Sequence, residues 1–330
     1  MKIKVAQFGL GQIGREITRL VLKRNRFELV GAVEKDEDKV GRDISDLLDL
    51  DRSTGIIVTD AREQVLADNP DLAFHSTSSK VSEVYNQLEN IMSAGANVIS
   101  TSEELSYPYL QAQDLAEELD NIAIENGVTL FGTGVNPGYA MDLLPLNLSG
   151  ISRDLDGIRV KRVQNASVRR KALQAKVGVG LTESEFDREI RQKGGHVGLI
   201  ESLSLVATGM GWQLDEVEDW TDPVINEERV ETEYFLARPG EVKGIDQTAV
   251  GRQDGEEKIR LNLQIYAGAS NPVDKITLKG VPDVTLKVEG GIHGDIATPA
   301  IAVNSSQKVL QESPGLLTLL DIYPYLYNFE

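Results

Sequence analysis

The chain has 330 residues, of which 41% are hydrophobic and 26% are charged. This length exceeds the size at which a single hydrophobic core usually stops growing, so we expect two domains, and no apolar run approaches the roughly 18 residues of a membrane span. The net charge of −18 argues against nucleic acid or an anionic membrane as a partner.

Cysteine is absent, and the histidines are His75, His196 and His293. Disulfides, thiolate metal sites and a cysteine nucleophile are therefore excluded. The histidines lie in separate parts of the chain without metal-ligand spacing, so no catalytic metal is expected. The first residues enter a strand pattern at once and show no secretory signal, which makes a cytoplasmic protein the simplest interpretation.

The first part of the chain alternates short apolar strands with amphipathic helices. Gly95 and Gly127 are placed to end two of these helices. The alternation predicts a parallel sheet that is covered on both faces. Strands are expected at residues 2–8, 27–33, 71–74, 97–100 and 128–131.

After about residue 150 the pattern changes. Residues 157–166 form a predicted strand, and residues 182–210 are predicted to be mainly helical. Residues 259–265 alternate apolar with polar side chains after a turn at 253–255, as in an antiparallel sheet with one buried face. Helical spacing returns at 295–311, and we expect this C-terminal part to pack back on the first domain.

A glycine motif, GLGQIG, follows the first predicted strand and opens the first predicted helix. Gly9 permits a tight turn, Gly11 lets the backbone approach a pyrophosphate, and Gly14 allows close helix packing. The helix N-terminus offers amide donors to the phosphates. The remaining residues of this motif, also expected at the dinucleotide, are Leu10, Gln12 and Ile13.

Glu34 lies 34 − 14 = 20 residues beyond the last glycine, where a carboxylate accepts hydrogen bonds from the adenosine ribose. This role of Glu34 favours NAD. Lys35 together with Arg42 would supply positive charge for the 2′-phosphate of NADP, so either cofactor is compatible with the sequence. The alternative is a glycine turn without a ligand and with solvated charges beside it. A further loop expected to contact the cofactor consists of Ser76, Thr77 and Ser78.

These patterns predict an α/β protein of two domains. The first is a Rossmann domain, with a doubly wound parallel sheet, and the second is an α+β domain for substrate binding and dimerisation, with a mainly antiparallel open sheet. The expected division is residues 1–142 with 294–330, and residues 143–293.

Two acids, Glu103 and Glu104, follow the strand expected at 97–100. Ligands in open α/β sheets bind beyond the carboxyl ends of strands, so these carboxylates are expected where the reacting carbon of a substrate would lie. Alternatively, with Ser102 as an N-cap, they are acids that favour the start of a helix.

Further along, Asn136 offers a donor and an acceptor to a nicotinamide carboxamide, or is an ordinary turn residue. Arg162 and Gln164 share one face of a predicted strand, and Arg162 would hold the carboxylate of an amino-acid substrate. Tyr139 and His196 complete the candidates for the substrate end. The alternatives are solvated sheet surface and a structural histidine.

Together the motifs resemble the 2,4-diaminopentanoate dehydrogenases and the related native amine dehydrogenases, which are similar in fold to dihydrodipicolinate reductase. The resemblance covers nearly the whole length. It implies reversible NAD(P)-linked deamination of an amine to a carbonyl compound and ammonia, and a homodimer. It rests on GLGQIG, AVEKDEDKVGRD, TSEELSYP, GTGVNPGYAMDLLP, GHVGLIES and GDIATPAIAVN, in that order.

By matching motif, the resemblance assigns the three glycines and Glu34 to the dinucleotide and Asn136 to the nicotinamide. It assigns one acid of Glu103 and Glu104 to catalysis, and we favour Glu104, which would bind and deprotonate the amine without a metal. The expected substrate is a short aliphatic aldehyde or ketone, or its amine.

Two other functions stay open. One is reduction of a cyclic imine or of a hydroxyl-ketone pair, as in dihydrodipicolinate reductase or homoserine dehydrogenase, although the paired-histidine and lysine segments of the former do not occur here. The other is a dinucleotide-sensing protein without turnover, because a Rossmann domain alone does not establish function.

Overall fold

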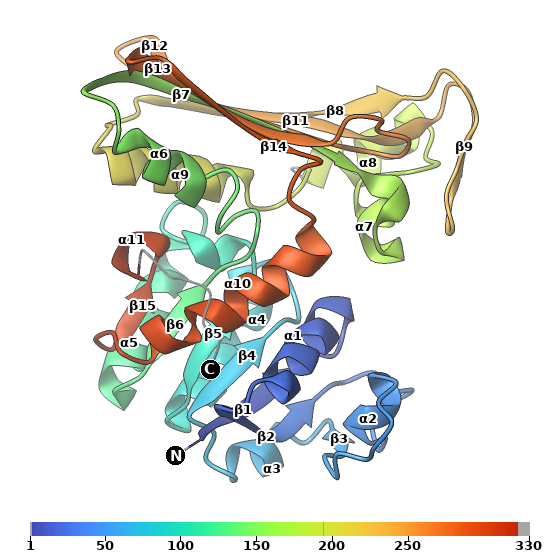
Figure 1. Ribbon diagram of the computed structural model, residues 1–330, viewed down its shortest axis with the longest axis vertical. Coiled ribbons are helices and arrows are strands. Elements are labelled where there is room, and N and C mark those ends of the chain that lie inside the picture. The colour runs from blue at the N-terminus through green and yellow to red at the C-terminus, as the bar shows by residue number, and fades with distance from the viewer. Residues whose placement is uncertain (1, 194, 323–330) are drawn as a thin grey trace. The chain divides into compact units, whose positions relative to one another are not determined.

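The computed structural model describes residues 2–193 and 195–322 (Figure 1). The chain forms two compact units: one runs to Val135 and resumes at Gly294, and the other is Asn136–His293. Among the described residues, no helix combines the length and the apolar character that crossing a membrane requires.

The first unit is built on a seven-stranded sheet in the order β15-β6-β5-β4-β1-β2-β3. Its strand pairs are parallel, which confirms the predicted Rossmann-type sheet. The order reverses between β1 and β4, which is where ligands of such sheets bind. The strands are β1 (Ile3–Phe8), β2 (Phe27–Val33), β3 (Val58–Thr59), β4 (Leu72–His75), β5 (Asn97–Ser100), β6 (Thr129–Gly132) and β15 (Gly315–Leu317).

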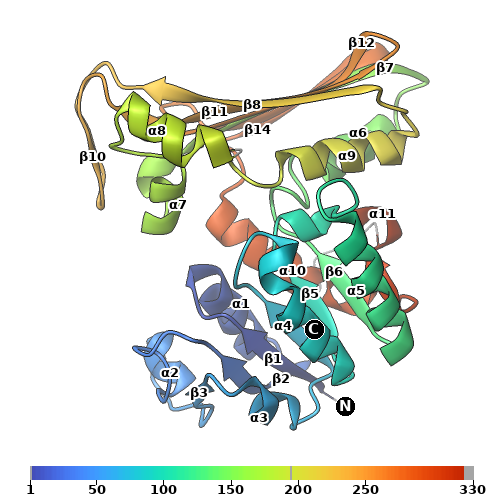
Figure 2. The same ribbon diagram turned by 180° about the vertical axis from the view of Figure 1, so that it is seen from behind.

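Helices cover both faces of this sheet (Figures 1 and 2). On one face α1 (Gln12–Lys23) packs against α10 (Gly294–Val309), and on the other α4 (Val81–Ser93) packs against α5 (Gln113–Asn126). Leu88 and Leu119 meet strand residues such as Leu130 in a fully buried core. Shorter helices are α2 (Ile44–Leu47), α3 (Arg62–Leu66), η1 (Glu104–Ser106) and α11 (Leu319–Ile322).

The second unit contains a six-stranded sheet in the order β14-β13-β7-β12-β11-β8. Only the β7–β12 pair of these described strands is parallel, so the prediction of a mainly antiparallel sheet is confirmed. Asp254 and Gly255, both with positive φ, make the turn between β11 and β12. The strands are β7 (Asp154–Asn165), β8 (Glu216–Ile225), β11 (Val242–Gln253), β12 (Glu256–Tyr266), β13 (Val273–Val281) and β14 (Val284–Glu289), and a separate small pair is β9 (Val230–Glu231) with β10 (Leu236–Ala237).

Helices lie on one face of this second sheet, and no helix in the described part of the unit covers the other face (Figures 1 and 2). Toward the helices, β12 buries the alternating residues Ile259, Leu261, Leu263 and Ile265, as the sequence pattern predicts. The helices are α6 (Leu143–Ser149), η2 (Ala166–Val168), α7 (Lys171–Lys176), α8 (Glu183–Glu189), η3 (Arg191–Lys193) and α9 (Leu199–Met210).

Candidate functional site

The glycine turn after β1 is crowded on one side and open on the other. A Cβ added at Gly14 would lie 1.9 Å from the carbonyl oxygen of Gly9, and one added at Gly9 would lie 2.5 Å from the carbonyl oxygen of Ser76. At Gly11, in contrast, a Cβ would meet nothing within 4 Å. Packing therefore explains two of the glycines, whereas the open space above Gly11 fits the close approach of a ligand such as a pyrophosphate.

Helix α1 begins directly at this turn. Gly11 is its N-cap in extended conformation, and no side chain caps the helix among the residues that the structure describes. Gln12 and Ile13 occupy its first turn, whose amides have no partner within the helix. The exposed amides and the helix dipole favour an anion at this point, which is what a bound dinucleotide would place there.

At the end of β2, Glu34 is held by the backbone around it. Its carboxylate accepts hydrogen bonds from the backbone N–H groups of Leu10 at 2.8 Å, Lys35 at 2.9 Å and Asp36 at 3.3 Å. The ammonium of Lys39 lies 3.4 Å from the same carboxylate. Burial alone would raise the pKa of Glu34, but the backbone donors and Lys39 outweigh it, and the pKa is lowered.

The loop after β4 packs onto the glycine turn. The hydroxyl of Ser76 donates to the carbonyl oxygens of Phe8 and Gly9, and it accepts from the amide of Gln7 at 3.0 Å. Thr77 lies 2.9 Å from His75 Nε2, and the Ser78 hydroxyl donates to Glu83. Of the loop residues expected at the cofactor, Ser76 thus supports the turn directly.

His75 joins the ends of β4 and β5. Its side chain is fully buried, with Nδ1 2.9 Å from Ser100 Oγ and Nε2 3.2 Å from Gln87 Oε1. Ser100 in turn donates to Ser102, whose hydroxyl donates to the Ser78 carbonyl at 2.6 Å. Burial lowers the pKa of His75 to about 4, against a smaller raising effect of Gln87, so the imidazole is neutral near pH 7.

The two acids after β5 sit at the carboxyl edge of the same sheet. Glu104 opens the short helix η1, and its N–H donates to the carbonyl of Ser79. Its Oε2 accepts from the backbone N–H of Val81, the first residue of α4, at 2.5 Å. No described residue donates a hydrogen bond to its Oε1. Glu103 precedes it and, like Glu104, is half-buried.

Asn136 comes soon after β6 and carries a buried oxygen. No described residue donates a hydrogen bond to its Oδ1. The turn beyond it is fixed by Asp142, which accepts from the N–H of Gly138 at 2.8 Å and from Ser202 at 2.7 Å. A buried carbonyl oxygen without a donor is costly unless a ligand supplies one, which fits the amide of a nicotinamide.

Arg162 is paired with other residues of the second unit. Its guanidinium is 2% exposed and donates to both carboxylate oxygens of Asp274, at 2.6 and 2.7 Å, and to the Ile292 carbonyl. Asp274 lies directly opposite it on β13. Burial lowers the pKa of Arg162, and the adjacent carboxylate of Asp274 opposes that effect. The carboxylate partner expected from a substrate is thus already provided by the protein.

The other expected substrate residues lie in three separate segments of this unit. Gln164 is buried on the helix-covered face of β7, and its amide donates to the Val163 carbonyl. His196 is buried, and its backbone N–H donates to the side chain of Gln247 on β11 at 2.9 Å. Tyr139 is half-buried in the turn before α6, and its carbonyl accepts from Leu144.

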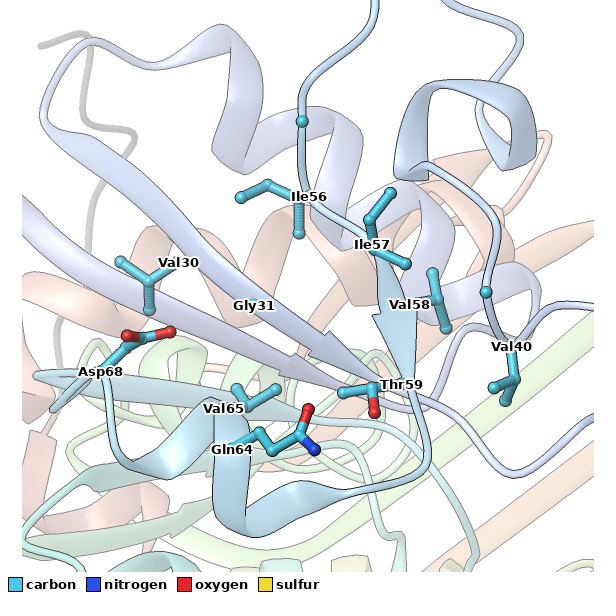
Figure 3. A pocket seen from close by; sticks show the side chains of 12 residues that line it. Val30, Gly31, Val40, Ile56, Ile57, Val58, Thr59, Gln64, Val65 and Asp68 are labelled. Atoms are coloured by element: carbon cyan, nitrogen blue, oxygen red, sulfur yellow. The ribbon is translucent and has the colours of Figure 1, made fainter.

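A cavity of about 410 Å³ opens at the β3 edge of the first sheet (Figure 3). Thr59, at its rim, accepts a hydrogen bond from the N–H of Glu34, so the cavity adjoins the end of β2. The size is in the range of small-molecule sites. None of its lining residues was expected from the sequence, and they are Val30, Gly31, Val40, Gly41, Gly55, Ile56, Ile57, Val58, Thr59, Gln64, Val65 and Asp68.

Comparison with known proteins places this geometry in a family. Residues 3–108 match the N-terminal domain of dihydrodipicolinate reductase, and residues 139–325 match the C-terminal domain of 2,4-diaminopentanoate dehydrogenase. The second match spans more than half of the chain. The chain belongs to the 2,4-diaminopentanoate dehydrogenase family. The family's enzymes are dehydrogenases, so this member is an oxidoreductase with an NAD(P)-binding Rossmann domain.

Full-length relatives agree with this assignment. A 2,4-diaminopentanoate dehydrogenase of Acetoanaerobium sticklandii is 30% identical, covering 97% of this family member and 93% of that protein. An amine dehydrogenase of Streptomyces virginiae is 25% identical, covering 97% and 96%. The structure of an amine dehydrogenase from Mycobacterium smegmatis matches with a TM-score of 0.90 at 25% identity, covering 99% and 98%.

Several residues that shape the site did not stand out in the sequence. Lys39 was visible within AVEKDEDKVGRD, but only the turn after β2 brings its ammonium to Glu34. Asp274 becomes the partner of Arg162 only through the register of β13 on β7. Asp142 has a sequence signal, since an acid before a helix is a typical N-cap, and its carboxylate accepts from the N–H of Leu143.

Proposed function

We propose that this family member is an NAD(P)-dependent amine dehydrogenase, which converts an amine reversibly to a carbonyl compound and ammonia. The observation that carries the proposal is the state of Glu104: Val81 fixes one carboxylate oxygen, and no described residue donates to the other. A carboxylate oriented by one backbone donor, with one oxygen available, is suited to bind and deprotonate an amine.

The bound dinucleotide supplies the redox chemistry, because its nicotinamide accepts hydride at C4. The protein contributes position and charge. Oε1 of Glu104 would take a proton from the ammonium form of the substrate and pass it to water, which leaves a neutral amine for hydride transfer. The carboxylate, ionised again, would then stabilise the iminium cation that forms as hydride leaves the carbon. Asn136 would receive the carboxamide N–H of the nicotinamide at its buried Oδ1. Water hydrolyses the iminium, and in the reverse direction Glu104 would hold ammonium and release it as ammonia.

On the substrate side, Tyr139, Gln164 and His196 are the candidates that remain for shaping the pocket. Arg162 is a weaker candidate, because Asp274 already engages its guanidinium. Arg162 therefore has no proposed role in binding a substrate carboxylate. A short aliphatic aldehyde or ketone, with ammonia, is the proposed substrate in the aminating direction.

The test is consumption of NADH and NADPH with a panel of short aldehydes and ketones at mildly alkaline pH, with and without a high concentration of ammonium. We expect oxidation of the cofactor that requires ammonium. Oxidation that ignores ammonium would support imine or alcohol chemistry instead. Dinucleotide binding without turnover on carbonyls, imines or amines would support a sensing protein and contradict the proposal.

We also propose that the protein is a homodimer joined through the helix-free face of the second sheet. The register places Lys287, Lys275 and Lys161 directly opposite one another on β14, β13 and β7. Like charges in this arrangement are destabilising unless a counter-charge approaches. Toward the other edge of the same face, Asp246 and Asp222 lie opposite each other on β11 and β8. Arg191, 3.4 Å from Asp222, offsets one of these two negative charges, so one net negative charge remains for the lysines of a partner.

A second copy of the chain matches this charge pattern. A two-fold axis parallel to the strands would lay the lysine end of one sheet over the acidic end of its partner, as an isologous interface requires. We expect the double variant Lys161→Glu with Lys275→Glu to dissociate in sedimentation analysis at low salt. Adding Asp222→Lys and Asp246→Lys should restore the dimer. A dimer unaffected by the first pair would contradict this interface.

A further inference from the structure

The end of β2 carries a carboxylate whose hydrogen-bonding capacity is already used. Glu34 accepts from three backbone N–H groups and from Lys39, which makes four donors on two oxygens. A carboxylate offers about four acceptor positions. Its side chain is 11% exposed. Glu34 therefore fastens the turn after β2 to the glycine turn, and it has little capacity left for two ribose hydroxyls.

Lys39 is the cation that this arrangement presents. Its ammonium lies 2.9 Å from Asp36 Oδ2 and 3.4 Å from Glu34 Oε2, and its side chain is 24% exposed. A tight turn brings it back to the strand end, since the N–H of Lys39 donates to the carbonyl of Asp36. An ammonium has three donors, so after two carboxylates one donor remains.

The electrostatic consequence concerns the phosphate that distinguishes NADP from NAD. Two bare carboxylates at the ribose end would repel a 2′-phosphate, whereas Lys39 offsets one of the two negative charges and offers a donor to the phosphate. Lys35 directly follows Glu34 in sequence, but its side chain is exposed. It would therefore lose more side-chain freedom than Lys39 on binding a ligand.

We propose that Lys39, held between Glu34 and Asp36, is the residue that lets the adenosine end of this site accept a 2′-phosphate. This inference rests on dinucleotide binding at the glycine turn, which is part of the proposed function. It does not depend on amine chemistry. Lys39 then sets the preference for the phosphorylated cofactor, and Glu34 positions it.

The experiment uses half-cofactors that cannot carry out redox chemistry. Binding of 2′,5′-ADP and of 5′-AMP to the full chain is measured by calorimetry for the native protein, Lys39→Met and Lys39→Arg. We expect Lys39→Met to weaken 2′,5′-ADP by about tenfold or more, as loss of a charge-assisted hydrogen bond implies, and to change 5′-AMP by less than about threefold. Lys39→Arg should restore most of the difference.

Lys35→Met is the matched control. It removes a positive charge of the same kind from an exposed side chain that lies 39 − 35 = 4 residues before Lys39. It should change the ratio of the two affinities less than Lys39→Met does. If Lys39→Met leaves the ratio of the 2′,5′-ADP and 5′-AMP affinities unchanged, either with no effect or with an equal loss of both, the proposal is overturned. A larger change of that ratio in Lys35→Met would also overturn it. If neither half-cofactor binds the native protein, dinucleotide binding itself is wrong, whereas an inactive protein that binds both refutes only the amine chemistry.

Discussion

Two regions of the carboxyl edge of the first sheet hold their glutamates in opposite ways. After β2, Glu34 accepts from four donors of the protein. After β5, Glu104 accepts from one, the N–H of Val81 at the start of α4, and no described residue donates to its second oxygen. The same side chain therefore serves as a fastener in one region and as an oriented, incompletely satisfied group in the other.

This difference separates structural from functional charged groups at such an edge. A fully satisfied charge gains little from a ligand, because the ligand must first replace bonds that the protein already makes. An oriented group with unused capacity keeps its hydrogen bonds to the protein when a ligand binds and gives up only water, so it is the better candidate for chemistry. By this criterion Glu104 and Asn136 are functional candidates, whereas Glu34 and Arg162 are mainly structural.

The largest effect is expected for Glu104→Gln. Glutamine keeps an oxygen that can accept from Val81, but it cannot take a proton from the amine, so kcat should fall by about 100- to 10,000-fold. Affinity for the dinucleotide should stay within about threefold of the native value, because the cap on α4 is retained. Steady-state kinetics and cofactor titration measure the two quantities separately.

The matched control is Glu103→Gln, which removes the same charge from the preceding residue. We expect its kcat to fall by less than about tenfold, because general base catalysis would remain in place. A large loss in this variant with near-normal turnover in Glu104→Gln would exchange the roles of the two acids and contradict the assignment made from hydrogen-bonding capacity.

Arg162, the satisfied cation of the other unit, is expected to contribute mainly to stability. Replacing it by methionine leaves the buried carboxylate of Asp274 without its counter-charge, and we expect unfolding to become easier by about 3–5 kcal/mol. The double variant Arg162→Met with Asp274→Asn should recover much of that loss, since it removes the stranded charge. Chemical denaturation measures both effects.

A kinetic measurement on the same double variant separates structure from recognition. If Arg162 only pairs with Asp274, the double variant should keep its KM for the carbonyl substrate close to the native value. A KM for a carboxylate-bearing substrate that stays raised by tenfold or more, roughly the worth of one charged hydrogen bond, would show that Arg162 binds substrate after all.

Sequence patterns predicted five of the seven strands of the first sheet closely, because buried parallel strands and glycine stops are local signals, but they missed the short strands β3 and β15. They predicted β2 and β5 at their observed bounds. They gave the positions of Glu34 and Glu104 as well, but not the difference between them. That difference depends on backbone N–H groups of Leu10 and Val81, which lie far away in sequence and come close only when β1, β2, β4 and β5 pack side by side.

Partners across a sheet were the least predictable contacts. Arg162 and Asp274 are separated by more than a hundred residues, and only the antiparallel register of β7 and β13 makes them neighbours. Lys39 was hidden for a different reason, since its segment reads as solvated charge until the turn after β2 closes. Register and loop closure depend on the whole core, so local patterns carry little information about either.

The smallest expected effect comes from His75, a satisfied group between the two glutamates, and it appears as a pH dependence. Burial lowers the pKa of His75 to about 4, whereas the unfolded chain titrates near the ordinary 6.5. Between these values the unfolded state binds the extra proton, so stability falls as the pH falls, by about 1.4 kcal/mol per unit and about 3 kcal/mol in all. His75→Gln removes this contribution, so the stability lost on going from neutral to acidic pH should be smaller in the variant than in the native protein by about that amount. Urea denaturation across this range measures the difference, and equal losses in the two proteins would mean that the pKa of His75 is the same in the folded and unfolded chains, which contradicts a lowering of the pKa by burial.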